Sequence, residues 1–130
     1  MLSTGLSHKE KTVVSKEMLA VNVHSGGLEV FSTPSMIALM EKTAYTLLQE
    51  QLSAEKTSVG IALNIKHLAA CREGQDVYAL AEITDILKDG RIVKFKVSAF
   101  DDFGLIGEGE HERAVVNTQK FLEKLDEKLK

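Results

Sequence analysis

The longest run of helical apolar periodicity in the chain covers residues 32–52. It opens with Ser32, Thr33 and Pro34, and a hydroxyl residue suits a helix cap while proline suits the first turn. At about 100° per residue, most of the apolar side chains gather on one stripe. These are Pro34, Ile37, Ala38, Ala44, Tyr45, Leu48 and Leu52. The pattern predicts one long helix with an apolar face.

Glu41 falls at the centre of this stripe, and Thr43, Thr46 and Glu50 take the opposite side of the predicted helix. A carboxylate among apolar side chains is costly to desolvate unless another group pairs with it. Glu41 is therefore a candidate functional group. The alternative is that its side chain reaches solvent or caps a buried polar group.

The rest of the chain is mostly strand-like. Apolar and polar residues alternate over 60–70, 76–87, 91–100 and 105–116, with a favoured Asp-Gly turn at Asp89 and Gly90. Gly107 and Gly109 share one face of the last strand, which indicates a close approach by another backbone or a helix. The sequence also predicts short strand pieces at 11–14 and 18–21, irregular structure before residue 11, and a charged helix over 118–130.

One helix cannot cover both faces of such a sheet. We therefore expect a curved antiparallel sheet wrapped around the long helix, which is the hotdog fold of the α+β class, in one domain over residues 1–130. A lone copy would leave a sheet edge and apolar surface uncovered, so a homodimer or higher homo-oligomer is expected.

Composition narrows the class of protein. The chain has 130 residues, 44% hydrophobic and 27% charged, which is typical of a globular protein. A net charge of −3 and the absence of tryptophan argue against a nucleic-acid partner. No membrane-spanning run or signal peptide is evident, and the single cysteine, Cys71, fits a cytoplasmic location.

His67 is the second residue that suggests chemistry. It follows Ile61, Leu63 and Ile65 at a period of two, so it is predicted to face the helix that carries Glu41 and begins near Thr33. A hydroxyl, a carboxylate and an imidazole near a helix N-terminus could support acyl transfer, because the imidazole can take a proton and the helix offers backbone donors to an oxyanion. The alternative is a core histidine with satisfied hydrogen bonds.

Three further stretches carry a resemblance to a known family. The segments 31–41, 59–70 and 106–116 read FSTPSMIALME, VGIALNIKHLAA and IGEGEHERAVV. In this order and spacing, the chain from about residue 31 to 121 resembles the fluoroacetyl-CoA thioesterases, a family of hotdog proteins.

The resemblance implies roles for five residues. Thr33, Glu41 and His67 would act together in thioester hydrolysis. Gly60 would lie beside the acyl group, and Arg113 would contribute to substrate binding. No cofactor is implied, because coenzyme A enters as part of the substrate.

These features together predict an acyl-CoA thioesterase for small acyl groups. His67 would be the general base, Thr33 the nucleophile or the hydroxyl that orients water, and Glu41 the group that orients the histidine or attacks directly. The alternatives are a non-catalytic acyl-CoA-binding hotdog protein and a hotdog hydratase. The segment 23–30 is shorter than the corresponding loop of the fluoroacetate-specific enzyme and lacks its phenylalanine gate, so selectivity for fluoroacetyl groups is not implied.

Other candidates rank lower. In the run 111–113, alternation sends Glu112 to the face opposite His111 and Arg113, so a solvated or interface strand is favoured over a metal site. His24 is predicted to be a loop residue, and nothing near Cys71 favours a nucleophile. Histidine and cysteine do not recur at zinc-binding spacings, so no metal is expected.

Overall fold

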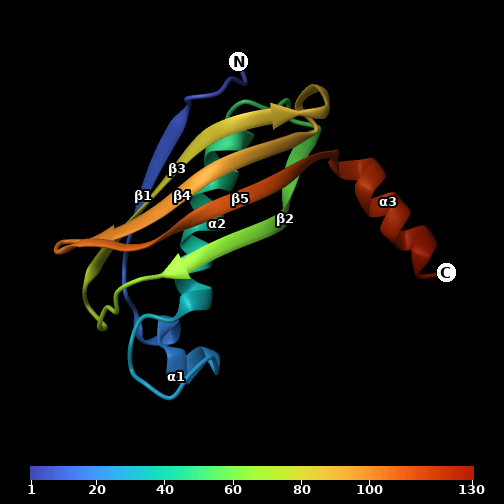
Figure 1. The fold of residues 1–130 in the computed structure, drawn as a ribbon. Helices are drawn as coiled ribbons and strands as arrows, with labels where there is room; N and C mark the ends of the chain where they lie inside the picture. The colour runs from blue at the N-terminus through green and yellow to red at the C-terminus, as the bar shows by residue number, and fades with distance from the viewer.

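The computed structural model describes all of residues 1–130. Five strands form one antiparallel sheet in the order β1-β3-β4-β5-β2, and the sheet curves around helix α2 (Figure 1). The strands are β1 (Ser7–Val13), β2 (Lys56–His67), β3 (Asp76–Leu87), β4 (Ile92–Asp101) and β5 (Gly104–Asn117). The helices are α1 (Ala20–Val23), α2 (Thr33–Gln49) and α3 (Thr118–Lys128).

Helix α2 begins where the cap residues predict. Ser32 is the N-cap, and its hydroxyl oxygen accepts a hydrogen bond of 3.1 Å from the Ser35 N–H. This satisfies one of the free amide groups of the first turn. Pro34 lies in that turn without the loss of a hydrogen bond, because an N–H at this position would have no acceptor within the helix. The cap fixes the position of Thr33 at the helix start.

The core lies between α2 and the concave face of the sheet. The helix buries large side chains along one face, and strands β3 and β4 supply small and β-branched side chains opposite. They are Met36, Met40, Leu47 and Leu48 of the helix, and Val77, Ala79, Ala81, Val93, Phe95 and Val97 of the strands. None of these ten side chains is more than 3% exposed, so this packing supplies most of the apolar burial.

The prediction that Glu41 lies at the centre of the buried face is wrong. The buried face is centred near Met40, about 100° around the helix from Glu41, which lies at its edge. Thr43, predicted to face solvent, is fully buried and donates a hydrogen bond of 2.7 Å to the Leu39 carbonyl. The periodicity failed because apolar side chains cover more of α2 than the side that the sheet buries, and because a threonine that bonds to its own helix can be buried.

The N-terminal prediction also needs correction. Residues 7–13 form β1, an edge strand that pairs with β3. Residues 18–21 are not a strand: Met18 ends a 3-10 turn, Ala20 begins α1, and only Leu19 makes an isolated bridge, to Phe31. Strand β1 was missed because its mostly polar side chains show no apolar alternation.

Strand β2 contains a bulge that decides which residues face α2. Gly60 pairs with Arg113 but Ala62 pairs with Glu112, so Ile61 is the extra residue. Beyond the bulge, Leu63, Ile65 and His67 share the inner face, as predicted. Because of the bulge, Gly60 and His67 lie on the same face although they are seven positions apart, a spacing that would put them on opposite faces of a regular strand.

The C-terminal helix α3 projects away from the sheet (Figure 1). Its start is capped by Asn117, whose side-chain oxygen accepts from the Lys120 N–H at 3.1 Å. None of its residues is buried, and Phe121, Leu122 and Leu125 remain substantially exposed. No helix of the structure is long and apolar enough to cross a membrane.

The two inner-facing glycines of β5 confirm the predicted close approach and give a testable difference. A Cβ on Gly107 would lie 2.6 Å from the flexible end of Met36, whereas a Cβ on Gly109 would overlap the backbone carbonyl of Asn64. We predict that Gly109→Ala lowers the free energy of unfolding by about 1–3 kcal/mol, as for overpacking, and more than Gly107→Ala does. Denaturant unfolding of both variants measures this, and equal losses would contradict the close packing of β2 against β5.

Candidate active site

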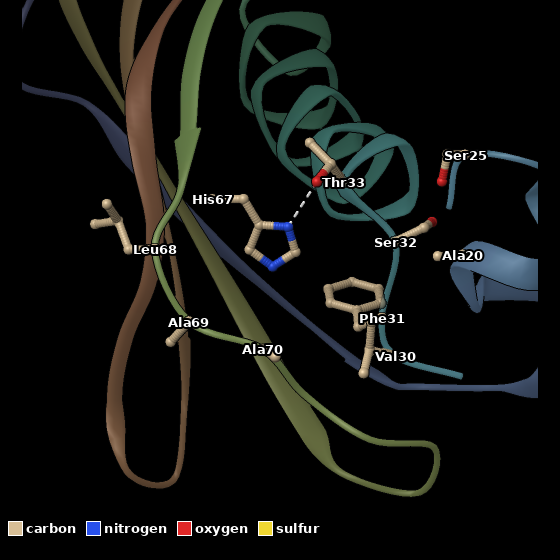
Figure 2. A pocket seen from close by; sticks show the side chains of 10 residues that line it. All are labelled: Ala20, Ser25, Val30, Phe31, Ser32, Thr33, His67, Leu68, Ala69 and Ala70. Carbon is tan, nitrogen blue, oxygen red and sulfur yellow. Dashed lines mark hydrogen bonds between the residues drawn. The ribbon is translucent and has the colours of Figure 1, made fainter. Parts of the chain in front are cut away.

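The end of β2 and the start of α2 bring His67 and Thr33 into contact. The Thr33 hydroxyl and His67 Nδ1 are 2.8 Å apart, a hydrogen bond between residues 34 positions apart in sequence (Figure 2). Phe31 meets the imidazole edge-on, with ring centroids 6.4 Å apart at 82°. His67 Nε2 is buried and has no partner within the chain. The imidazole is therefore held by one nitrogen, with the other free to react.

These residues line a cavity of about 300 Å³. Its walls are the segment before α2, the start of α2 and the residues after β2 (Figure 2). The lining includes Phe31, Ser32, Thr33, His67, Leu68 and Ala69. A cavity of this size, with apolar and polar groups in its wall, suits a small acyl group.

Burial shapes the acid–base state of the imidazole. Desolvation lowers the pKa of His67, and a backbone contact at Ala69 opposes this in part. The neutral form therefore persists below the ordinary value near 6.5. A neutral imidazole beside a hydroxyl can act as a general base at physiological pH.

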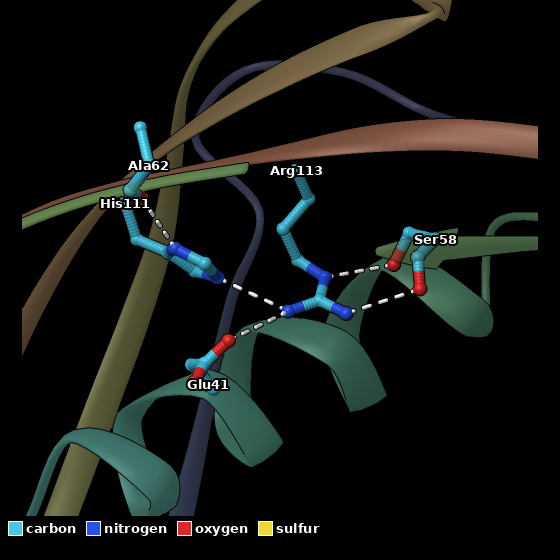
Figure 3. A network of polar contacts seen from close by, with 5 residues as sticks. All are labelled: Glu41, Ser58, Ala62, His111 and Arg113. Carbon is cyan, nitrogen blue, oxygen red and sulfur yellow. Dashed lines mark hydrogen bonds and ion pairs between the residues drawn. The ribbon is translucent and has the colours of Figure 1, made fainter. Parts of the chain in front are cut away.

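Glu41 belongs to a second polar group, built around Arg113 of β5. The Arg113 guanidinium lies 3.7 Å from the Glu41 carboxylate, with which it forms an ion pair (Figure 3). It also donates two hydrogen bonds to Ser58, from Nε to the hydroxyl oxygen at 2.8 Å and from Nη2 to the carbonyl oxygen at 3.1 Å. Its Nη1 lies 3.1 Å from His111 Nε2. The guanidinium carbon also lies 5.7 Å from the centre of the Tyr45 ring. Five contacts thus hold one buried cation.

Gly60 completes this second group. A Cβ there would lie 2.6 Å from the Glu41 carboxylate and 3.4 Å from Arg113 Nη1, so the lack of a side chain admits both. The Glu41 side chain remains 37% exposed, whereas that of Arg113 is 7% exposed. Burial lowers the pKa of Arg113, and Glu41 acts in the opposite direction. The carboxylate therefore faces outward beside the glycine.

Within one chain, the five predicted site residues form two groups. The structure joins Thr33 to His67, and it joins Glu41 to Gly60 and Arg113, with no hydrogen bond or ion pair between the groups. Thr33 and Glu41 are about 12 Å apart along the helix axis. Gly60 and His67 are roughly 20 Å apart along β2.

His111 and Ser58 are site residues that sequence reasoning missed. His111 is 1% exposed and stacks on Phe95 at 6.0 Å, so the expectation of a solvated strand at 111–113 is wrong. The signal was present in the parity of β5, since His111 and Arg113 share the inner face with the two glycines. Nothing in the sequence marks Ser58, because its role depends on the pairing of β2 with β5.

The remaining candidates lie outside both groups. His24 has a left-handed backbone with φ of 62° and is exposed in a loop, as predicted. Cys71 is buried, and burial raises the pKa of its thiol to about 11, so it is poorly suited to be a nucleophile. No cluster of three or more histidine, cysteine, aspartate or glutamate side chains could hold a metal ion.

A curved antiparallel sheet around one long helix, with a histidine–hydroxyl pair beside a small cavity, defines a hotdog-fold protein equipped for acyl transfer. The comparisons with known proteins narrow this class. The family of fluoroacetyl-CoA-specific thioesterases, FlK, matches residues 14–119. The fluoroacetyl-CoA thioesterase of Streptantibioticus cattleyicolor is 37% identical over 100 residues, which are 77% of this chain and 70% of that enzyme.

Solved structures agree with this match. A structure of the fluoroacetyl-CoA thioesterase FlK superposes with a TM-score of 0.91 at 30% identity, over 98% of each chain. A thioesterase superfamily member from Thermus thermophilus gives a TM-score of 0.86 at 26% identity, over 98% of this chain and 92% of that one.

The chain belongs to the fluoroacetyl-CoA-specific thioesterase family. The predicted hotdog fold and the predicted thioester hydrolase are thereby confirmed. The match spans both polar groups of the site.

Proposed function

We propose that this protein hydrolyses small acyl-CoA thioesters, with Thr33 and His67 as the reacting pair. The observation that carries the proposal is the buried, unpartnered Nε2 of His67, in an imidazole that also contacts the Thr33 hydroxyl and lines a 300 Å³ cavity. A reactive nitrogen without an internal partner is costly to bury, and functional sites retain such costs.

Hydrolysis can follow either of two routes from this geometry. In one, His67 Nδ1 takes the proton of the Thr33 hydroxyl as the hydroxyl oxygen attacks the thioester carbon, and the coenzyme A thiolate leaves with that proton; water then hydrolyses the acyl-threonine. In the other, His67 takes the proton of a water that Thr33 orients, and the unpartnered Nε2 is the nitrogen open to that water. Either way, the Thr33 N–H would be the donor at the start of α2 that is open to the negative charge developing on the carbonyl oxygen, because Pro34 has no N–H and the Ser35 N–H bonds to Ser32.

We propose a homodimer joined along β2. In it, Glu41 and Gly60 of one chain would lie opposite Thr33 and His67 of the other. This strand is a sheet edge with unpaired backbone groups. Apolar side chains near it are at least 40% exposed, namely Tyr45, Ile61, Leu63 and Leu68. An antiparallel pairing of two β2 strands would cover both features.

The two ends of β2 fit such a pairing. A two-fold axis through Asn64 would pair Leu63 with Ile65 and Ala62 with Lys66. Because Ile61 is the extra residue of the bulge, Gly60 of one chain would then lie against His67 of the other. Directly paired residues of an antiparallel ladder point to the same face, and Gly60 and His67 already share the inner face because of the bulge. Each active site would then combine Thr33 and His67 of one chain with Glu41, Gly60 and Arg113 of its partner.

In this composite site, Glu41 would orient or stabilise the charged imidazole, or attack the thioester itself. Arg113 would hold Glu41 and help to bind the substrate. Gly60 would let the acyl group approach the backbone. We propose no cofactor, since coenzyme A enters with the substrate, and a cytoplasmic location for this one domain of residues 1–130.

The substrate class follows from the cavity and from relatives. Solved structures of FlK variants hold fluoroacetate or acetyl-CoA. The cavity here is small, which favours short acyl groups. Residues 23–30, ahead of α2, carry no phenylalanine, so we propose that the enzyme accepts short acyl-CoA thioesters without selecting the fluorinated one.

Thiol release from a panel of short, branched and aryl acyl-CoAs tests the activity. We predict turnover of the short members, with His67→Ala lowering kcat/KM by roughly a hundredfold or more, the scale of a lost general base. His8→Ala, on the far edge strand β1, is the matched control and should retain parental activity. No release from any member, or equal activity of His67→Ala and the parent, would favour a binding protein over an enzyme.

The dimer has its own test. Leu63→Lys places a charge on the free edge strand, so it should yield a folded monomer and lower turnover. Leu80→Lys is the control, because Leu80 is similarly exposed, at 37% against 42%, but lies on β3 inside the sheet order. Light scattering at micromolar concentration measures the mass. A parent that is monomeric, or a Leu63→Lys variant that stays dimeric, would contradict pairing along β2.

A further inference from the structure

His111 is a buried titratable group that the reaction scheme above leaves unused. It lies on β5 beside the guanidinium of Arg113 (Figure 3). Its ring also stacks on Phe95 of β4. Its ring is 1% exposed, so every hydrogen bond that it makes is to the protein. The contacts of its two nitrogens decide its chemical state.

Nδ1 of His111 lies 2.8 Å from the Ala62 carbonyl oxygen. A carbonyl only accepts, so Nδ1 carries the proton. Nε2 lies 3.1 Å from Arg113 Nη1, and a guanidinium only donates, so Nε2 must be unprotonated. Both bonds form together only in the neutral Nδ1–H tautomer. The imidazolium would turn an acceptor into a donor facing another donor.

The bond from Arg113 to His111 completes a set that fixes the guanidinium plane. Ser58 accepts from Nε and Nη2, and His111 accepts from Nη1, which also faces Glu41. The ion pair with Arg113 is the one polar side-chain contact of Glu41 within the chain, so its place beside Gly60 depends on Arg113. His111 thus acts on the carboxylate through one intermediate residue.

We propose that His111 is a positioning residue, a neutral hydrogen-bond acceptor that aligns Arg113 and through it Glu41, and that its protonation disarms the site at low pH. Protonation places a second cation against Arg113 in a buried site and makes it a competitor for Glu41. The rate consequence rests on the proposed thioesterase function, whereas the tautomer and the alignment of Arg113 do not.

The surroundings of the ring lower the pKa of His111 on balance. Burial is the main cause that lowers the pKa of His111, the neighbouring Arg113 lowers it further, and Glu41 of α2 and Glu112 of β5 oppose this. The parts of β2 and β4 that meet the ring, Ala62 and Phe95, carry no charge. The neutral tautomer therefore persists below pH 6.5 and is lost as the pH falls further.

Nitrogen-15 NMR of the labelled parent tests the state directly, with the His111→Gln spectrum assigning the signals. We expect a protonated Nδ1 and an unprotonated Nε2 at pH 7.5. The Arg113 Nε–H signal should be sharp there and should broaden as His111 gains its proton. The other tautomer, an imidazolium at pH 7.5, or an Arg113 signal indifferent to that titration would overturn the proposal, whatever the enzyme activity.

The pH profile of kcat/KM tests the consequence for the rate. A glutamine amide keeps a donor and an acceptor flanking one carbon, as imidazole does, but does not titrate in this range. In the parent, both His67 and His111 must be unprotonated, and each requirement lowers kcat/KM tenfold per pH unit on the acid side. The fall of kcat/KM should therefore approach a hundredfold per pH unit in the parent and tenfold in His111→Gln.

Two further variants separate alignment from stability. His111→Leu keeps volume but loses both bonds, and we expect kcat at pH 8 to fall by about a hundredfold, as for a misplaced group, with His111→Gln restoring most of it. His8→Gln should keep the parental profile. If kcat/KM fell equally steeply with decreasing pH in the parent and in His111→Gln, and thermal melting showed that both are folded, the proposed control of the rate by His111 would be overturned. A parent without activity at any pH would remove the proposed function but leave the NMR result standing.

Discussion

The packing of α2 into the concave sheet is the constraint on which the rest of the structure depends. The helix buries Met36, Met40 and Leu47 against the strands, and β5 presents glycines where the helix and β2 come close. This packing fixes the position of α2 both along its own axis and across the sheet. Thr33 consequently meets the end of β2 at His67, and Glu41 meets Gly60 near the other end of the same strand.

A second constraint follows, since β5 places a guanidinium inside this packing. A buried cation without partners is strongly destabilising, so Arg113 has hydrogen-bond or charge partners on several of its neighbours. Ser58 and His111 satisfy it from the sheet, and Glu41 supplies the opposite charge from the helix. The contacts that stabilise the buried cation also hold the Glu41 carboxylate in one place, so the same network supports the fold and the role that we propose for Glu41.

The sequence predicted the parts of the fold that are set by local patterns. The N-cap at Ser32, the alternation over 76–87 and the position of His67 on the inner face were all read correctly. The family match then supplied the class of reaction. These features need only neighbours along the chain.

The wrong predictions concern features that depend on contacts between distant parts of the chain. The prediction of the buried face of α2 was wrong because apolar side chains cover more of the helix than the sheet buries. The position of the sheet selects the buried side, and the periodicity of the helix does not contain that information. Strand β1 was missed because an edge strand needs few apolar residues. The environments of His111 and Ser58 depend on the register of β2 against β5, including a bulge that shifts parity, and a single sequence carries no signal for that register.

Complementation between two variants tests the central claim most directly, namely that each active site takes His67 from one chain and Glu41 from the other. His67→Ala and Glu41→Gln would be purified separately, shown to be folded dimers of low activity, unfolded together in equal amounts and refolded. Half of the dimers formed at random would be mixed, and each would hold one intact site of two, so activity should rise to about a quarter of the parental value. A refolded mixture no more active than the two variants refolded apart would contradict the shared site.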